Sequence, residues 1–363
     1  MPPADPHGPG EPGVRLSILD ASPVKSGATA VDAFAETSAL ARSADQLGFN
    51  RYWVTELHGS RLNAGSTPEV TMAHIASITE RIRVGSGATL LNHRSPYAVA
   101  ETFAQLNAMF PGRIDLGLGR ATAGSLVDLA LQQDRSRPRT PGDHEQQVTE
   151  VLAWLAHDFP ADHPFAVVPL SEGVEGSPQP WILGSSPSSG ALAGRLGLSY
   201  AFAGFLAPRA APAAIAAYRS AFDANGSPQA RDAPYVLLAI NAACAVSDEE
   251  AAAIGASAEL VYRSAAGGQR LESVPSSSDA TWALGGTPQP TEYRPGRWPS
   301  TLSGSPDRLR DVIQHMADEV GADEIAVQDM IAEPTARQLS YELLADAFSL
   351  KALPAADPHA THG

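Results

Sequence analysis

The stretch from Arg81 to Arg120 constrains the fold more than any other, because it reads as strand, helix, strand. Apolar residues suit a strand over 82–91, and their spacing changes to that of a helix over 96–110. A second apolar run, 114–118, ends in a glycine and Arg120. Parallel strands joined by a helix gather ligand sites at their carboxyl ends. Arg120 is therefore expected either to bind a ligand or to pair with a buried carboxylate.

The same alternation of strand and helix runs along almost the whole chain. The predicted strands are 15–20, 51–55, 82–91, 114–118, 181–186, 200–203, 235–246 and 324–328. The predicted helices are 30–46, 68–80, 96–110, 145–157, 188–196, 210–222, one beginning at 247, 306–320 and 335–350. This pattern predicts an α/β fold of the (β/α)8 type, a TIM barrel. A doubly wound sheet is the alternative, but no GxGxxG motif opens a helix after the first strand.

Two segments exceed what a minimal barrel needs, and we expect both as long insertions at the carboxyl-terminal mouth. They are residues 122–142 and residues 265–303. Loops of such length are usually functional or disordered. Trp282, Tyr293 and Trp298 favour a lid or an interface for the second segment, and local packing under a long loop is an equal alternative.

We expect one barrel domain over residues 14–350, with a disordered leader, 1–13, and a disordered tail, 351–363. The leader has no basic or apolar stretch and does not resemble a secretory signal.

The chain has a net charge of −15, which opposes non-specific nucleic-acid binding. No apolar run approaches the roughly 20 residues that span a bilayer. The single cysteine, Cys244, is expected as a packed thiol and fits a reducing cytoplasm. These features predict a cytoplasmic protein without nucleic-acid or membrane partners. The histidines show no metal-ligand spacing, so no metal site is expected.

Several segments, in order, resemble the bacterial luciferase-like flavin monooxygenases, and most of all their subgroup in bacterial secondary metabolism. They are RYWVTELH, AHIASITERIRVGSGATLLNH, AETFAQLNAMFPGRIDLGLGRA, WILGSSPSSGALAGRLGLSYAFAGF, SGSPDRLRDVIQHMADEVGADEIAV and SYELLADAF. The resemblance extends from about Arg15 to Phe348 and weakens only in the two insertions. It implies the same barrel that the alternation predicts.

The resemblance implies FMN across the carboxyl-terminal mouth of the barrel. Arg120 matches the phosphate-binding arginine of the family, and a guanidinium fork suits a phosphate. The turn of Gly184, Ser185, Ser186 and Ser189 matches the other half of the phosphate site. Hydroxyls and backbone N–H groups at a helix start bind anions. Simple N-capping is a parallel interpretation, and relatives often have a carboxylate at Ser185.

Gly87 and Ala88 match a pair that in the family forms a non-prolyl cis peptide beneath the flavin ring. We therefore expect both residues to contact the ring and the bond between them to be cis. Small residues are also common in any tightly packed barrel strand, so the residues alone would support this assignment only weakly.

The chain departs from the family at Leu57, where relatives commonly have a histidine linked to catalysis. The family's acid/base role therefore does not carry over to this position, and Leu57 is expected to form an apolar wall of the substrate pocket. Glu56 is expected beside the flavin, and His58 is the candidate catalytic acid/base, although a lone histidine is more often structural. His93 and Trp282 are the other candidates for the substrate pocket.

The resemblance implies an FMN-dependent monooxygenase that oxidises a small hydrophobic or aromatic metabolite, in a secondary-metabolite pathway. Reduced FMN, supplied by a separate flavin reductase, would react with O2 through a C4a-peroxyflavin. A homodimer formed by helices of the early half is also implied. The alternatives are a deazaflavin-dependent dehydrogenase or reductase, and a catalytically degenerate flavin- or ligand-binding homologue.

Overall fold

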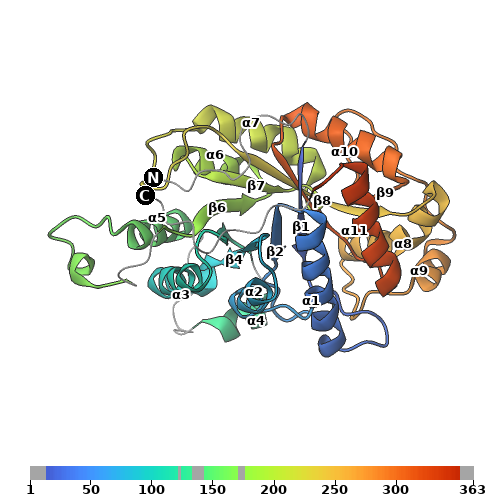
Figure 1. The fold of residues 1–363 in the computed structure, drawn as a ribbon, viewed down its shortest axis with the longest axis horizontal. Coiled ribbons are helices and arrows are strands. Elements are labelled where there is room, and N and C mark those ends of the chain that lie inside the picture. Colours follow the sequence, from blue (N-terminus) through green and yellow to red (C-terminus); the bar gives the residue numbers. More distant parts are fainter. Residues whose placement is uncertain (1–13, 122–123, 133–142, 171–175, 352–363) are drawn as a thin grey trace.

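A computed structural model describes residues 14–121, 124–132, 143–170 and 176–351. Its parallel strands close into a barrel, because β10 pairs with both β1 and β8 (Figure 1). The barrel strands are β1 (Arg15–Asp20), β2 (Arg51–Val54), β3 (Arg83–Ser86), β5 (Ile114–Gly119), β6 (Gln179–Gly184), β7 (Ser199–Ala203), β8 (Val236–Cys244) and β10 (Glu324–Gln328). The predicted TIM barrel is confirmed.

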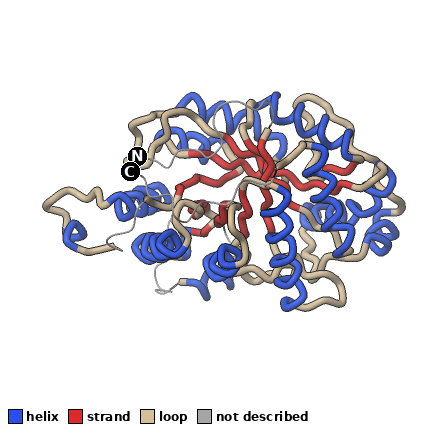
Figure 2. Tube along the Cα trace, in the orientation of Figure 1, coloured by secondary structure: helices blue, strands red, loops and turns tan. Residues whose placement is uncertain are grey.

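Helices surround the strands on the outside of the barrel (Figure 2). They are α1 (Ala30–Leu47), α2 (Pro68–Ser77), α3 (Pro96–Met109), α5 (Asp143–Ala156), α6 (Pro187–Arg195), α7 (Ala211–Ala221), α8 (Asp248–Ala266), α10 (Pro306–Val320) and α11 (Pro334–Ala347). The largest core lies between the outer face of the strands and these helices, with residues such as Ile18, Tyr52 and Phe103 fully buried. The strand–helix alternation of the sequence arises from this two-layer packing.

Local signals determine where the helices begin and end. In α1, Thr29 and Asp32 form a capping box that satisfies backbone N–H groups at the first turn. Gly48 ends the helix with a left-handed φ of 90°, which a residue with a side chain rarely adopts. The predicted boundaries of this helix are therefore met within one residue.

The inside of the barrel is filled and closed at its amino-terminal end. Leu19, Trp53 and Trp181 belong to an apolar layer in which the two indole rings meet edge to face at 5.0 Å. Below it, Arg51 donates hydrogen bonds to Asp115 at 2.8 Å and to Glu324 at 3.1 Å. Burial alone would raise the pKa of Asp115, but Arg51 and Arg83 outweigh it and hold that pKa below its ordinary value. The carboxyl ends of the strands are therefore the end at which a ligand site can form.

The third strand, which the sequence predicts to be interrupted at Gly85, Ser86 and Gly87, is divided into β3 and β4 (Thr89–Leu90). The structure also adds elements that were not predicted from the sequence. A short helix, α4 (Ser125–Leu131), follows β5. Within 265–303 lies α9 (Ser277–Leu284), and at its end β9 (Leu302–Gly304) extends the sheet beside β8. Short 3-10 turns are η1 (Leu91–His93), η2 (Pro164–Val167) and η3 (Pro208–Ala210).

Two of the three aromatic residues in 265–303 pack locally. Tyr293 and Trp298 each donate a hydrogen bond of 2.8 Å to Glu319 of α10, and Trp298 is only 5% exposed. Trp282 is 86% exposed. Another part of the segment reaches the strand ends, because Val274 bridges to Lys25 just after β1. Whether this segment acts as a lid stays a prediction.

Three further expectations concern the two ends of the chain, membrane-spanning helices and the single cysteine. The leader, 1–13, and residues 352–363 of the tail lie outside the described residues. No helix among the described residues is long and apolar enough to cross a membrane. Cys244 is 1% exposed, and burial raises the pKa of its thiol to about 12, so it is a packed thiol.

Candidate active site at the carboxyl ends of the strands

Gly87, Ala88 and Gly119, at the ends of β3 and β5, form a surface with no side chain larger than a methyl group, here called the flat surface. The peptide bond between Gly87 and Ala88 is cis, and both residues are half-buried. Gly119 ends β5 so close to Ala88 that an added Cβ would lie 2.7 Å from the Cβ of Ala88. A Cβ on Gly87 would lie 2.5 Å from the side chain of Leu19 beneath it. The strand ends can therefore accept a flat group pressed directly against the backbone.

The serine turn between β6 and α6 is built as a helix cap. The Ser186 hydroxyl accepts a hydrogen bond from the backbone N–H of Ser189, and the Ser189 hydroxyl accepts one from the backbone N–H of Ser186. The Ser189 and Tyr200 hydroxyls lie 2.9 Å apart. A Cβ at Gly184 would overlap Ser189, so the turn is compact. The N-capping interpretation is confirmed, and phosphate contact by Ser185, Ser186 and Ser189 stays a prediction.

Arg120 and Gly184 leave neighbouring strands side by side. In the pairing of β5 with β6, Leu118 lies opposite Ile182, so both chains emerge two residues later at the same edge. Paired strands are about 4.8 Å apart. Arg120 is exposed there. Arg120 and the chain that leads into α6 therefore leave the barrel at the same edge, as the family resemblance implied.

His144, at the start of α5, also belongs to this edge. Its pKa is lowered, first by burial and then by the positive charge of Arg120. Its Nδ1 is buried and has no hydrogen-bond partner among the described residues. No pattern in the sequence indicates this proximity, because a long insertion separates His144 from Arg120. An anion at this position would lower the repulsion between the two groups.

Glu56 lies at the centre of a buried polar cluster below the mouth. The residue is 3% exposed, and its carboxylate accepts a hydrogen bond of 3.0 Å from the Leu90 N–H. It also pairs with Arg94 at 3.1 Å and lies 2.7 Å from His58 Nε2. The Glu56 carboxylate therefore joins the segment that follows β2 to strand β4, through a hydrogen bond and ion pairs within the protein. Contact between Glu56 and the cofactor stays a prediction.

Two histidines meet at the rim, each beside a carboxylate. His58 lies beside Glu56, and His93 Nε2 is 3.4 Å from Asp128 of α4. Their ring centroids are 6.2 Å apart in an edge-to-face arrangement. Leu57, between Glu56 and His58, is 38% exposed. The structure thus brings Glu56, His58 and His93 together, with Leu57 beside them in the chain, and their catalytic and substrate roles stay predictions.

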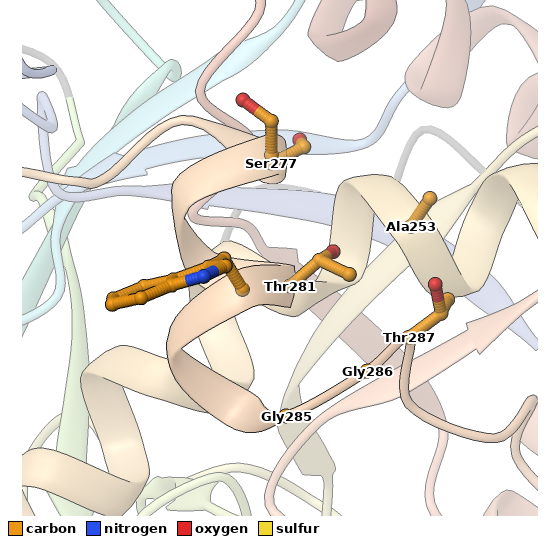
Figure 3. A pocket seen from close by; sticks show the side chains of 8 residues that line it. Ala253, Ser277, Thr281, Gly285, Gly286 and Thr287 are labelled. Carbon is orange, nitrogen blue, oxygen red and sulfur yellow. The ribbon is translucent and has the colours of Figure 1, made fainter.

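Trp282 is not brought to this edge by the contacts of the described residues. It lies on α9 in an open hollow lined by residues of α8, of α9 and of the chain that leaves α9 (Figure 3). In Figure 1, α9 and α5 lie at opposite ends of the molecule. Its assignment to the substrate pocket stays a prediction without structural support.

The described residues fit a flat ring that carries a phosphate group. A flat ring requires backbone approach without side chains, which Gly87, Ala88 and Gly119 provide. A phosphate requires cations and N–H donors, which Arg120 and the start of α6 offer at the adjoining edge. Among the described residues no group of histidine, cysteine and carboxylate side chains could hold a metal ion.

Known proteins resemble this chain over most of its length. The sequence profile described as luciferase-like monooxygenase matches residues 14–332. The chain is 32% identical over 335 residues to the N-acetyl-S-alkylcysteine monooxygenase of Bacillus subtilis, covering 92% of this chain and 98% of that protein. The crystal structure of apo-MsnO8 has a TM-score of 0.83 at 38% identity, covering 93% of this chain and 99% of that one.

A more distant solved structure shares the fold. The oxygenating constituent of 3,6-diketocamphane monooxygenase from Pseudomonas putida, in complex with FMN, has a TM-score of 0.65 at 19% identity. The match covers 94% of this chain and 99% of that one. At this identity the comparison shows the fold alone.

Proposed function

The chain belongs to the luciferase-like monooxygenase family, and we propose that it uses reduced FMN and O2 to oxidise a small hydrophobic metabolite. The proposal rests on one observation above the rest. Gly87, Ala88 and Gly119 lie at adjoining strand ends and carry no side chain larger than a methyl group, directly before Arg120. A flat ring with a phosphate arm matches such a surface and the cation beside it.

The residues of the chain would divide the work of binding. Arg120, His144 and the N–H groups at the start of α6 would hold the phosphate, while Gly87, Ala88 and Gly119 would support the ring. When bound, reduced flavin supplies the reaction with O2, and the protein orients the substrate and excludes water. The Pseudomonas putida monooxygenase of the same fold was solved in complex with FMN, which supports this choice of flavin.

His58 is the proposed group that holds or moves a proton. Its Nε2 lies 2.7 Å from Glu56, which orients the ring and leaves Nδ1 for a ligand. The test is stopped-flow reoxidation of the bound reduced flavin by O2 across pH. We expect His58→Gln to flatten the pH dependence of that rate. An unchanged pH profile would leave His58 with a structural role only.

Exposed apolar residues at the mouth favour a hydrophobic substrate. Leu57 is 38% exposed and Leu206, which follows β7, is 64% exposed. Both follow barrel strands at the carboxyl end, where the substrate would meet the flavin. A substrate gains affinity for an apolar pocket wall mainly through the apolar area that is buried between them. Screening compounds of graded hydrophobicity for turnover with reduced FMN and O2 tests this point, and preferred turnover of charged compounds would contradict it.

The test of the cofactor is a titration of the purified protein with reduced FMN and with reduced deazaflavin, both without oxygen. We expect FMN to bind more tightly, with substrate oxidation that depends on O2. Tighter binding of the deazaflavin, with substrate oxidation that reduces added oxidised deazaflavin in the absence of O2, would replace the proposal by a deazaflavin-dependent dehydrogenase.

We also propose that a separate reductase supplies the reduced flavin, since no nicotinamide-binding GxGxxG motif follows the first strand. Mixing the protein with NADH and FMN, with and without a flavin reductase, tests this step. Rapid NADH oxidation by the protein alone would contradict it.

A further inference from the structure

A large hollow lies on the outside of the barrel between α8 and α9. It has a volume of about 830 Å³ and is lined by Ala253, Ser277, Ser278, Thr281, Trp282 and residues 285–287. Ser277 and Thr281 project from α9, Ala253 from α8, and Gly285 to Thr287 form the edge below them (Figure 3). None of the lining residues is charged.

Trp282 distinguishes this hollow from the rest of the surface. It is 86% exposed, whereas the other four tryptophans, Trp53, Trp154, Trp181 and Trp298, are at most 5% exposed. A solvent-exposed indole leaves a large apolar area in contact with water. Tryptophan is enriched among the residues that dominate protein interfaces. An exposed indole beside a hollow therefore indicates a surface that a partner covers.

The charged residues around the hollow indicate the sign of the charge that such a partner would carry. Asp279 precedes Trp282 by three residues on α9, and Glu250 precedes Ala253 by three residues on α8, so each lies one turn from a lining residue. Both are exposed. Of the other acidic residues between Arg270 and Arg294, Glu272 pairs with Arg61 and Glu292 pairs with Arg294. The negative charge beside the hollow is therefore that of Glu250 and Asp279.

We propose that this hollow is a docking site for a basic segment of a partner protein, with an arginine side chain of the partner over Trp282. A guanidinium stacks on an indole face and is attracted by its π electrons. Glu250 and Asp279 would attract the same cation and speed its approach. The site lies apart from the proposed flavin edge, so it stands or falls independently of the proposed function.

The test uses acetylated, amidated hexa-arginine as the probe and the full-length protein. Isothermal titration gives the dissociation constant, and indole N–H resonances identify Trp282 as the contacted tryptophan. We expect Trp282→Ala to weaken binding roughly fivefold and Trp282→Phe to weaken it less, because a phenyl ring keeps part of the attraction. Raised salt should weaken binding to the wild type.

A charge-matched control separates docking from general attraction to an acidic protein. Glu250→Gln removes one charge at the hollow, and Glu80→Gln removes one charge after α2, where the Glu80 side chain is 74% exposed. We expect Glu250→Gln to weaken binding roughly threefold and Glu80→Gln to change it little. Equal effects of these two variants would overturn the proposal. So would binding to Trp282→Ala that matches the wild type, provided that the unfolding midpoint of the variant is unchanged.

Discussion

Glu56 accepts a hydrogen bond of 3.0 Å from the backbone N–H of Leu90, which joins the chain after β2 to the strand that follows Gly87 and Ala88. The same carboxylate pairs with Arg94, whose other nitrogen lies 2.7 Å from Glu69. The position of the flat surface therefore depends on a carboxylate that itself points into the protein. Burial is the first cause of the raised pKa of Glu69, and Arg94 offsets part of it.

Replacing Glu56 by glutamine should destabilise the protein. The amide keeps an acceptor for Leu90 but loses the charge that Arg94 pairs with, so we expect a loss of about 1–3 kcal/mol in the free energy of unfolding. Urea denaturation measures it. Glu101→Gln, at an exposed site on α3, is the control and should change stability by less than about 0.5 kcal/mol. Equal urea midpoints for Glu56→Gln and the wild type would contradict this role.

A side chain at Gly119 should harm both packing and flavin binding. The added Cβ of Gly119→Ala would lie 2.7 Å from the Cβ of Ala88, so one strand end must shift. We expect a stability loss of about 1–3 kcal/mol and a weaker FMN affinity in a fluorescence titration. Gly267→Ala is the matched control, because its Cβ would meet ordinary contacts of 3.4 Å or more at a φ of −80°. Wild-type FMN affinity in Gly119→Ala would argue against a ring on this surface.

The barrel could be predicted from the sequence because each of its strands is a short apolar run followed by a helical pattern. The spacing of the apolar residues follows from which side of each strand or helix is buried, so it indicates the type of element. The helix α9 escaped prediction because SSDATWAL is short and has a single buried residue, Ala280, so it has no apolar stripe. The division of the third strand was indicated by the flexible residues Gly85, Ser86 and Gly87, and the structure places the break after Ser86.

The site was predicted less completely than the fold. Arg120 and the serine turn were expected together from the family resemblance, and the pairing of β5 with β6 places them at one edge. The direction of the Glu56 carboxylate depends on Arg94 and Leu90, which no local pattern of residues specifies. The charge of Arg120 acts on His144 across an insertion, and no pattern in the sequence indicates that the two residues lie near each other.

Stability should fall in acid, and Asp20 should account for part of the fall. Burial raises the pKa of Asp20, but Arg337 and the Thr37 and Tyr52 hydroxyls outweigh it and hold that pKa below 3.8. The unfolded state therefore takes up this proton first as the pH falls. The contribution of Asp20 is complete above the unfolded pKa and is lost as the pH falls through the folded pKa.

Asp20→Asn tests this linkage by urea unfolding between pH 7 and pH 3. The variant should lose about 3 kcal/mol at pH 7, because Arg337 keeps a buried charge with one partner fewer. Its stability should then depend less on pH than that of the wild type. Parallel pH curves for the two proteins would show that other carboxylates cause the acid sensitivity.

The proposed homodimer has a candidate surface on α1 and α2. Ser38 and His74 contact each other at 2.9 Å, and Phe34 and Val70 each lie one turn before this pair. Val70 is 69% exposed and Val31, next to Phe34 on α1, is 78% exposed. These apolar side chains therefore share one face, as an interface requires. We expect Val70→Asp to convert the dimer to monomer in light scattering.

The control for the dimer is Val167→Asp, which places the same charge at an 84% exposed valine in η2. This variant should keep the mass of the wild type. A monomeric wild type, or a dimer unaffected by Val70→Asp, would exclude this face as the interface.

Arg120 should distinguish FMN from riboflavin, which has the same ring without the phosphate. A charge-assisted hydrogen bond to phosphate contributes about 1.5–3 kcal/mol, or roughly a 10- to 100-fold change in affinity. Arg120→Ala should therefore weaken FMN binding by this factor in a flavin fluorescence titration and leave riboflavin binding nearly unchanged. Arg310→Ala, at a half-exposed site on α10, is the control for loss of one positive charge and should affect neither ligand. If Arg120→Ala weakened both ligands equally, the arginine would act on the ring or on the fold, and the phosphate would have to bind elsewhere.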